Sequence, residues 1–243
     1  MRSQIPMEAT KHYARQCEHM RLEIICGLLK KGDSVLDIGC GVGNYISNPL
    51  GWLPISITAI DSDEKTIQYA NQQNIHHNLE FIVATGEEFE TTDKFDMIIC
   101  SHVLEHTERP MVLLEKMKQL LKEDGVLYLG IPNGFGWFEI QNTIPRLMFK
   151  LKWGRRVIAR MMRMKDTLNI DSQHVQFFTL GRINRLLKQL GWQVVKQIND
   201  EFLGGIIFDR VLPYSTLLAK WNVSVADKIP SQMANGWIFI CKK

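Results

Sequence analysis

Short apolar runs alternate with longer segments in which apolar residues recur every three or four positions. Runs such as "DMIIC" and "VLYLGI" are almost continuously apolar, which is typical of strands buried on both faces of a parallel sheet. Strands that alternate with helices in this way predict an α/β protein with helices on both faces of one sheet. The predicted strands are Ser34–Ile38, Ser56–Asp61, Leu79–Ala84, Phe95–Ser101, Gly125–Ile131, Trp192–Ile198 and Gly236–Cys241.

Four segments between these strands show the helical period. In the first of them Leu22, Ile25 and Leu29 share one stripe, as expected of a helix that packs on a sheet. Gly32 and Gly191 follow the first and the last of these segments, which predicts a glycine at the carboxyl end of each helix. The predicted helices are Thr10–Leu29, Glu64–Asn74, Pro110–Leu121 and Leu180–Leu190.

The alternation is interrupted twice. Residues 133–173 separate the fifth and sixth strands and contain Pro145 and Gly154, which predict two short helices instead of one long helix. Residues 202–235 form a second, irregular insertion before the last strand. We therefore expect a single domain over residues 1–243 that carries these two insertions.

The composition of the chain indicates the class of protein and the compartment in which we expect it. The 243 residues are 45% hydrophobic and 23% charged, with a net charge of +3, which is ordinary for a soluble protein. The five cysteines contain no CxxC pair, so neither a disulfide framework nor a zinc site is indicated. No apolar run approaches the ~20 residues that span a bilayer, and the first residues lack the apolar core of a secretory signal. A cytoplasmic protein is the simplest expectation.

Positive charge is concentrated in the first insertion. Its second predicted helix, which includes Arg156, Arg160 and Arg163, is basic on one face and apolar on the other. Such a helix either packs its apolar face on the core or recruits something anionic. The anionic alternatives are a phosphate-bearing or lipid-linked acceptor and, through residues 145–165, a membrane surface. The eight basic residues without an intervening acid are Arg146, Lys150, Lys152, Arg155, Arg156, Arg160, Arg163 and Lys165.

The first strand leads into a glycine-rich turn, "VLDIGCGVGNY" at residues 35–45. Gly39, Gly41 and Gly43 permit a sharp turn and a close approach of bare backbone to a ligand. The spacing fits neither the GxxxxGK[ST] of a phosphate-binding loop nor the GxGxxG of a dinucleotide fold. Asp37 is poorly placed for a diphosphate and well placed for a cationic ligand.

Asp61 ends the second strand, where a carboxylate can accept both ribose hydroxyls of a nucleoside. The alternative role for Asp61 is to cap the following helix, although Ser62 or Asp63 could provide that cap. After the third strand, residues 85–87 would flank an adenine ring if the ligand is an adenosine.

Together these segments resemble the class I S-adenosylmethionine-dependent methyltransferases. Within that group "SHVLEH" and "GIPN" are similar to the branch of quinone-biosynthesis and sugar O-methyltransferases. The motifs that carry the resemblance are "VLDIGCGVGNY", "AIDSDEKTIQYA", "FIVATGEEFE", "FDMIICSHVLEHTERPMVLLEKMKQLLKEDGVLYLGIPN" and "HVQFFTLGRINRLLKQLGW".

The resemblance implies a Rossmann-like seven-stranded sheet ordered 3-2-1-4-5-7-6, with strand 7 antiparallel and a helical lid in residues 133–173. It also implies S-adenosyl-L-methionine as the methyl donor. The residues implied for cofactor binding are Asp37, Gly39 and Gly41 at the methionine moiety, Asp61 at the ribose, Ser62 near the adenosine, Thr85, Gly86 and Glu87 beside the adenine, and Ser101 and His102 beneath the methionine end.

Methyl transfer from a sulfonium needs a nucleophile held in line with the methyl group, and a general base only for a nucleophile such as a hydroxyl. His106, after the fourth strand, and His174, after the first insertion, are the catalytic candidates. A zinc site at His102 and His106 is disfavoured, because the HExxH order and a third ligand are missing.

We therefore expect O-methylation of a small-molecule, glycan or lipid-linked acceptor. The alternatives are an RNA or protein methyltransferase and a protein that binds S-adenosylmethionine without turnover. Nucleic acid is disfavoured, since no RNA-binding module is visible.

Overall fold

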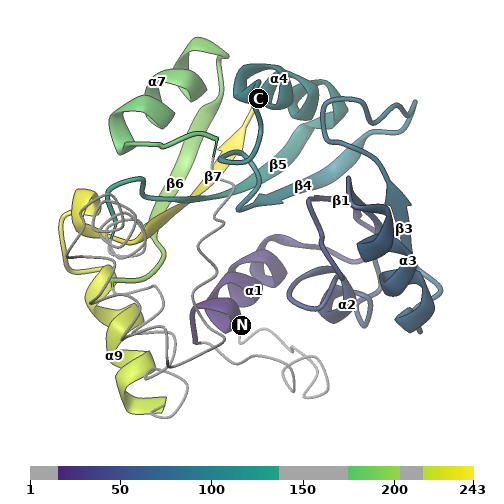
Figure 1. Ribbon diagram of the computed structural model, residues 1–243, viewed down its shortest axis with the longest axis horizontal. Helices are drawn as coiled ribbons and strands as arrows, with labels where there is room; N and C mark the ends of the chain where they lie inside the picture. Colours follow the sequence, from purple (N-terminus) through teal and green to yellow (C-terminus); the bar gives the residue numbers. More distant parts are fainter. Residues whose placement is uncertain (1–15, 137–174, 203–215) are drawn as a thin grey trace, which may run out of the picture.

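The computed structural model describes residues 16–136, 175–202 and 216–243, and in these residues seven strands form one sheet (Figure 1). The strand order is β3-β2-β1-β4-β5-β7-β6. Neighbouring strands from β3 to β5 are parallel, and β7 is antiparallel to both β5 and β6. This arrangement confirms the predicted order. The strands are β1 (Ser34–Ile38), β2 (Ser56–Asp61), β3 (Leu79–Val83), β4 (Phe95–Ser101), β5 (Leu121–Pro132), β6 (Gln193–Asn199) and β7 (Gly236–Lys242).

The helices of the described residues fill the connections between these strands. Gly191 directly follows the C-cap of α7 and has φ of +68°, as predicted for a glycine at the carboxyl end of a helix. Gly32 does not cap α1 as predicted: it lies four residues beyond Leu28, in a turn where its φ is +88° and its N–H donates to the carbonyl of Pro54. None of these described helices is both long enough and apolar enough to cross a membrane. The helices are α1 (Gln16–Leu28), α2 (Ser47–Leu50), α3 (Glu64–Gln73), α4 (Pro110–Leu120), α7 (Leu180–Gln189) and α9 (Thr216–Ala226), with a 3-10 helix η3 (Ser231–Met233).

Beyond shifts of one residue at the ends of several elements, the observed elements differ from the predicted ones in three ways. Strand β5 begins at Leu121 instead of Gly125, because Leu121 pairs with Phe95 before the register of β4 and β5 shifts. The short helix α2 was not predicted. The second insertion was expected to be irregular, but it contains α9 and η3. Nearly all of residues 133–173, with the two expected short helices and the basic segment, lies outside the described residues.

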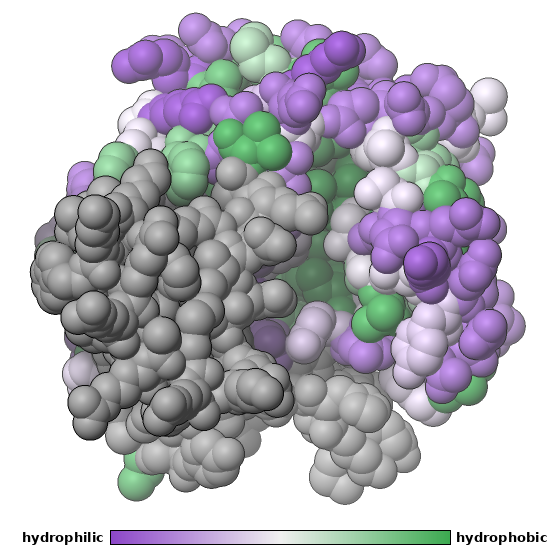
Figure 2. All heavy atoms as spheres, viewed as in Figure 1, coloured by the Kyte–Doolittle hydropathy of each residue, from purple (hydrophilic) through white to green (hydrophobic). Residues whose placement is uncertain are grey.

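Buried apolar side chains lie on both faces of the sheet, and successive residues of β1 alternate between two clusters. The cluster that contains Leu36 includes side chains of α4 and α7, while the cluster that contains Val35 includes side chains of α1 and α3. Figure 2 shows hydrophobic residues in the depth of a recess near the middle of this face, with mainly hydrophilic residues above and to the right of it. Helices therefore cover both faces, as predicted.

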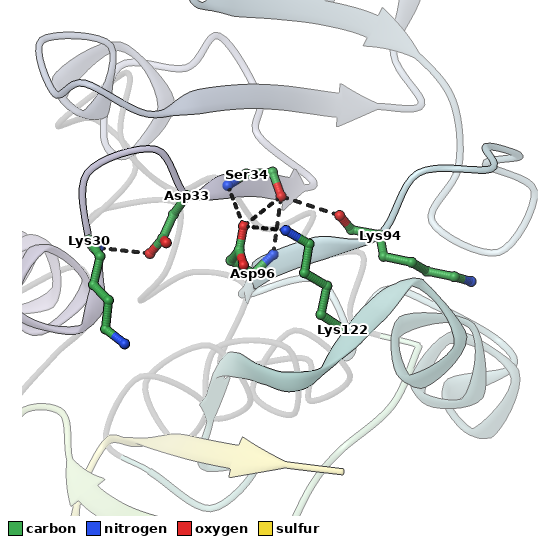
Figure 3. Close-up of polar contacts among 6 residues, drawn as sticks. All are labelled: Lys30, Asp33, Ser34, Lys94, Asp96 and Lys122. Atoms are coloured by element: carbon green, nitrogen blue, oxygen red, sulfur yellow. Dashed lines mark hydrogen bonds and ion pairs between the residues drawn. The ribbon is translucent and has the colours of Figure 1, made fainter.

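A polar cluster ties the amino-terminal ends of three adjacent strands (Figure 3). Oδ2 of Asp96 in β4 accepts hydrogen bonds from the backbone N–H and the hydroxyl of Ser34 in β1, at 2.8 and 2.9 Å, and from Nζ of Lys122 in β5 at 2.7 Å. These contacts hold β1, β4 and β5 together at the amino-terminal edge of the sheet. The candidate residues lie at the opposite edge, at the carboxyl ends of the strands.

Candidate functional site

The residues predicted to bind a cofactor lie in or directly after β1, β2, β3 and β4. These four strands are parallel neighbours, so their carboxyl ends meet at one edge of the sheet. This edge is where ligands bind in open α/β sheets. The fold thus brings the loops that carry Gly39–Gly41, Asp61–Ser62, Thr85–Glu87 and Ser101–His102 to one place.

The glycine turn after β1 is held by β2. The backbone N–H groups of Gly39 and Cys40 both donate to the carbonyl of Ile60, at 2.8 and 3.0 Å. Gly39, Gly41 and Gly43 have φ of +72°, +56° and +76°, a region that disfavours other residues. The N–H groups of Gly39 and Cys40 are thus bonded within the protein, which agrees with the argument from spacing against a diphosphate.

The three glycines differ in what surrounds them. A Cβ on Gly39 would lie 2.2 Å from Cγ2 of Val103, and a Cβ on Gly43 would lie 2.6 Å from Cζ of Phe81. A Cβ on Gly41 would meet no atom within 4 Å. At Gly39 and Gly43 the protein itself fills the space beside the backbone. The bare backbone expected to face a ligand is therefore found at Gly41.

The carboxylate of Asp61 reaches this turn from the end of β2. Its Oδ2 accepts a hydrogen bond from the N–H of Gly41 at 2.9 Å, and its Oδ1 accepts one from the N–H of Asp63 at 3.0 Å. Helix α3 is capped by Asp63, whose side chain accepts from the N–H of Lys65. The alternative role of Asp61 as a helix cap thus belongs to Asp63, and Asp61 lies beside the open space at Gly41.

Asp37 lies deeper than Asp61. Its side chain is only 2% exposed, and its Oδ2 accepts a hydrogen bond of 2.5 Å from the hydroxyl of Ser47 in α2. Burial raises the pKa of Asp37 to about 7. The hydrogen bond from Ser47 opposes this increase, and the charge of Asp61 adds a smaller increase. Ser47 was missed as a partner. That Asp37 faces an amino group of the cofactor stays a prediction.

The raised pKa of Asp37 has a measurable consequence for stability. Protons bind the folded protein more tightly than the unfolded chain, so this stabilisation is complete below about pH 4 and is lost as the pH rises to about 7. Between pH 5 and pH 8 we expect the free energy of unfolding to fall by on the order of 2 kcal/mol more for the wild type than for Asp37→Asn. Chemical denaturation at both pH values measures this difference. Equal losses in the two proteins would contradict the assignment.

The loops after β3 and β4 are joined to each other. The carboxylate of Glu87 accepts a hydrogen bond from the hydroxyl of Thr107. Thr85 closes its own turn, because its hydroxyl accepts from the N–H of Glu88 at 3.2 Å. Gly86 is buried, and a Cβ there would lie 2.6 Å from Cδ1 of Leu113. The segment expected beside the adenine is therefore packed against α4 and bonded to the loop that carries the histidines.

The motif "SHVLEH" places a buried carboxylate between two partly exposed imidazoles. Oε1 of Glu105 lies 3.5 Å from Nδ1 of His102 and 4.0 Å from Nε2 of His106. The side chain of Glu105 is 1% exposed, whereas those of the histidines are 38% and 44% exposed. Burial by itself raises the pKa of Glu105, but contact with His102 and the charge of His106 outweigh it and hold the pKa below its usual value. The carboxylate is thus ionised at neutral pH.

The chain returns to this motif after the first insertion. The backbone N–H groups of Val175 and Gln176 both donate to the carbonyl of Glu105 at 2.9 Å. His174, the second catalytic candidate, lies outside the described residues. In the part of the chain that the structure describes, no three His, Cys, Asp or Glu side chains are grouped so as to hold a metal ion.

Comparison with protein families matches residues 9–197 to a methyltransferase domain. A relative named ubiquinone biosynthesis O-methyltransferase, from Glaesserella parasuis, is 37% identical over 110 residues. That match spans 42% of this chain and 46% of the relative, which is less than half of either.

Solved structures share the fold at low identity. A TehB-like SAM-dependent methyltransferase from Corynebacterium glutamicum superposes with a TM-score of 0.56 and 14% identity, covering 92% of this chain and 86% of that one. A magnesium protoporphyrin IX methyltransferase from Synechocystis, with bound SAH, gives a TM-score of 0.58 and 14% identity over 93% and 81% of the two chains.

Proposed function

The chain belongs to the class I S-adenosylmethionine-dependent methyltransferases, and we propose that it methylates a hydroxyl group of a small molecule. The observation that supports binding of the methyl donor is the carboxylate of Asp61 beside the open space at Gly41. A nucleoside can approach the backbone there, and the carboxylate can accept hydrogen bonds from its ribose.

The described residues fit the cofactor. Gly41 offers backbone without a side chain, Asp61 offers an anionic acceptor, and the polar loop at Thr85–Glu87 is held in place beside them. When bound, S-adenosylmethionine supplies a methyl group on a positively charged sulfur. The ionised Glu105 and the ionisable Asp37 place negative charge at the ends of β4 and β1, which favours a cationic ligand.

The acceptor is proposed from the relatives. The relative from Glaesserella parasuis is named as an O-methyltransferase of ubiquinone biosynthesis. We propose a phenolic hydroxyl as the acceptor for this chain. A glycan or lipid-linked acceptor, an anionic acceptor and membrane contact through residues 145–165 stay predictions from the sequence. We further propose that residues 1–243 act as one domain, in which residues 133–173 cover the acceptor.

Cofactor binding tests this function first. Calorimetry should show that S-adenosylmethionine and S-adenosylhomocysteine bind the purified protein, while NAD, which carries the diphosphate that the glycine spacing disfavours, does not. Binding of NAD instead, with no heat from S-adenosylmethionine at about millimolar concentration, would overturn the proposal.

A panel of acceptors then separates an enzyme from a protein that only binds the cofactor. Methylated product from catechol or a related phenol, detected by mass spectrometry, is the expected result. Binding of S-adenosylmethionine with product from RNA or protein instead would replace the acceptor that we propose. Binding without product from any acceptor class would favour the non-catalytic alternative.

A further inference from the structure

The buried carboxylate of Glu105 has two imidazoles as its polar neighbours in the described part of the chain. Neither of its oxygens has a hydrogen bond among the described residues, although the side chain is 1% exposed. An isolated buried carboxylate is costly, so its surroundings must provide positive charge or an N–H donor. Among the described residues, Nδ1 of His102 at 3.5 Å and Nε2 of His106 at 4.0 Å can do so.

The two histidines are not equivalent. His102 is the closer, at 3.5 Å against 4.0 Å, and it directly follows β4 at the edge where the cofactor is proposed to bind. Its backbone N–H donates to the carbonyl of Gly130 in β5 at 2.9 Å, which fixes it between two strands. The next residue, Val103, fills the space beside Gly39 of the glycine turn.

His102 also has the backbone conformation that marks functional positions. Its φ is +58°, and among the described residues it is the only one other than glycine with a positive φ. Such conformations persist only where surrounding contacts enforce them, and they cluster at active sites. The enforcing contacts here are the bond to Gly130 and the packing of Val103.

The direction of the imidazole decides which nitrogen is available. Because Nδ1 of His102 faces the carboxylate of Glu105, the neutral ring should carry its proton on Nδ1. Nε2 then keeps its lone pair and faces away from Glu105, on a side chain that is 38% exposed. At His106 it is Nε2 that faces Glu105, and from farther away.

From this geometry we propose that His102 is the general base for the acceptor hydroxyl and that Glu105 is the residue that positions it. The proposal rests on the proposed O-methylation. As the hydroxyl oxygen forms its bond to the methyl carbon, the carbon–sulfur bond breaks and its electron pair leaves with sulfur. The hydroxyl proton passes to Nε2 of His102. A buried carboxylate behind an exposed imidazole is the arrangement that orients histidine bases in other enzymes.

The tautomer of His102 tests the pairing without any acceptor. In ¹⁵N NMR spectra of the protein of residues 1–243 with S-adenosylhomocysteine at about pH 8, we expect the neutral ring of His102 to carry its proton on Nδ1. Its signal is assigned by its loss in His102→Gln. Glu105→Gln should convert it to a mixture of tautomers, whereas His106→Gln should leave it unchanged. A proton on Nε2 of His102 in the wild type would overturn the proposal.

Acceptor acidity tests the role in catalysis. With catechol, His102→Gln should lower kcat about 100-fold, and affinity for S-adenosylmethionine, which His102 is expected to contact, should fall by a much smaller factor. With 4-nitrocatechol, whose hydroxyl ionises far more readily, the loss in kcat should be under about tenfold, because a base is no longer needed.

Glu105→Gln should lower kcat with catechol about tenfold, and this loss in kcat should again be smaller with 4-nitrocatechol. His77→Ala, an exposed histidine after α3, should behave as the wild type.

The contrary results are distinct. Equal losses with both acceptors, a loss of cofactor affinity instead of kcat, or an acidity-dependent loss in His106→Gln in place of His102→Gln would each overturn the assignment. If the wild type binds S-adenosylmethionine but methylates neither catechol, the proposed acceptor has failed. The tautomer measurement then still decides whether Glu105 holds His102.

Discussion

Replacing Gly39 with alanine should lower the free energy of unfolding by about 2–5 kcal/mol. About 1–2 kcal/mol of this loss comes from a side chain at a φ of +72°. The remainder comes from the Cβ, which would lie 2.2 Å from Cγ2 of Val103 and force the branched side chain or the turn to move. Chemical denaturation without ligand measures the loss.

Gly41→Ala is the matched control. Gly41 has a φ of +56°, but a Cβ there meets no atom within 4 Å, so the loss should be only about 1–2 kcal/mol. Its new methyl group should instead weaken cofactor binding, because it enters the open space beside Asp61. Adding Val103→Ala to Gly39→Ala should recover part of the stability. Equal stability of the two alanine variants would show that the contact with Val103 does not limit residue 39.

Loss of the Asp61 carboxylate should weaken binding of S-adenosylmethionine by about 10- to 150-fold. This factor corresponds to about 1.5–3 kcal/mol, the contribution of hydrogen bonds to a charged group. Asp61→Ala removes the proposed acceptor for the ribose and also leaves the N–H of Gly41 without its partner. Calorimetric titration of the variant and the wild type gives the comparison.

Asp63→Ala tests whether the effect belongs to Asp61 alone. Asp63 caps α3, so its removal should lower the stability of the protein slightly and leave cofactor affinity unchanged. An Asp61→Ala protein with the affinity of the wild type would move the ribose contact elsewhere. Weakening by Asp63→Ala as large as that by Asp61→Ala would mean that the conformation of the loop, and not the carboxylate, governs binding.

The elements predicted well are those whose signal is local. Continuous apolar runs located β1, β2 and β4 with the bounds that the structure has, because buried parallel strands need apolar side chains on both faces. Gly191 marked the end of α7, since a positive φ there favours glycine, whereas Gly32 belongs to the turn before β1. The position of Asp61 at a strand end sufficed to place it beside the glycine turn.

What the sequence could not show depends on contacts between distant residues. Helix α2 has four residues, too few for a period, so Ser47 could not be recognised as the partner of Asp37. Position 39 requires glycine because Val103 fills the space beside it. Val103 lies 64 positions away in the sequence, so no local pattern reveals this requirement. Glu105 is one acid between two histidines in the sequence, and only the fold shows that its side chain is buried.

The position of β7 constrains the order in which the sheet can assemble. In the described sheet β6 pairs only with β7, and β7 pairs with β5 on its other side. Strand β6 therefore cannot join the sheet before residues 236–242 are available. During synthesis from the amino terminus, β1 to β5 and their loops can form first. The proposed nucleoside site, which lies in those loops, can therefore form in the nascent chain before β6 and β7 join the sheet.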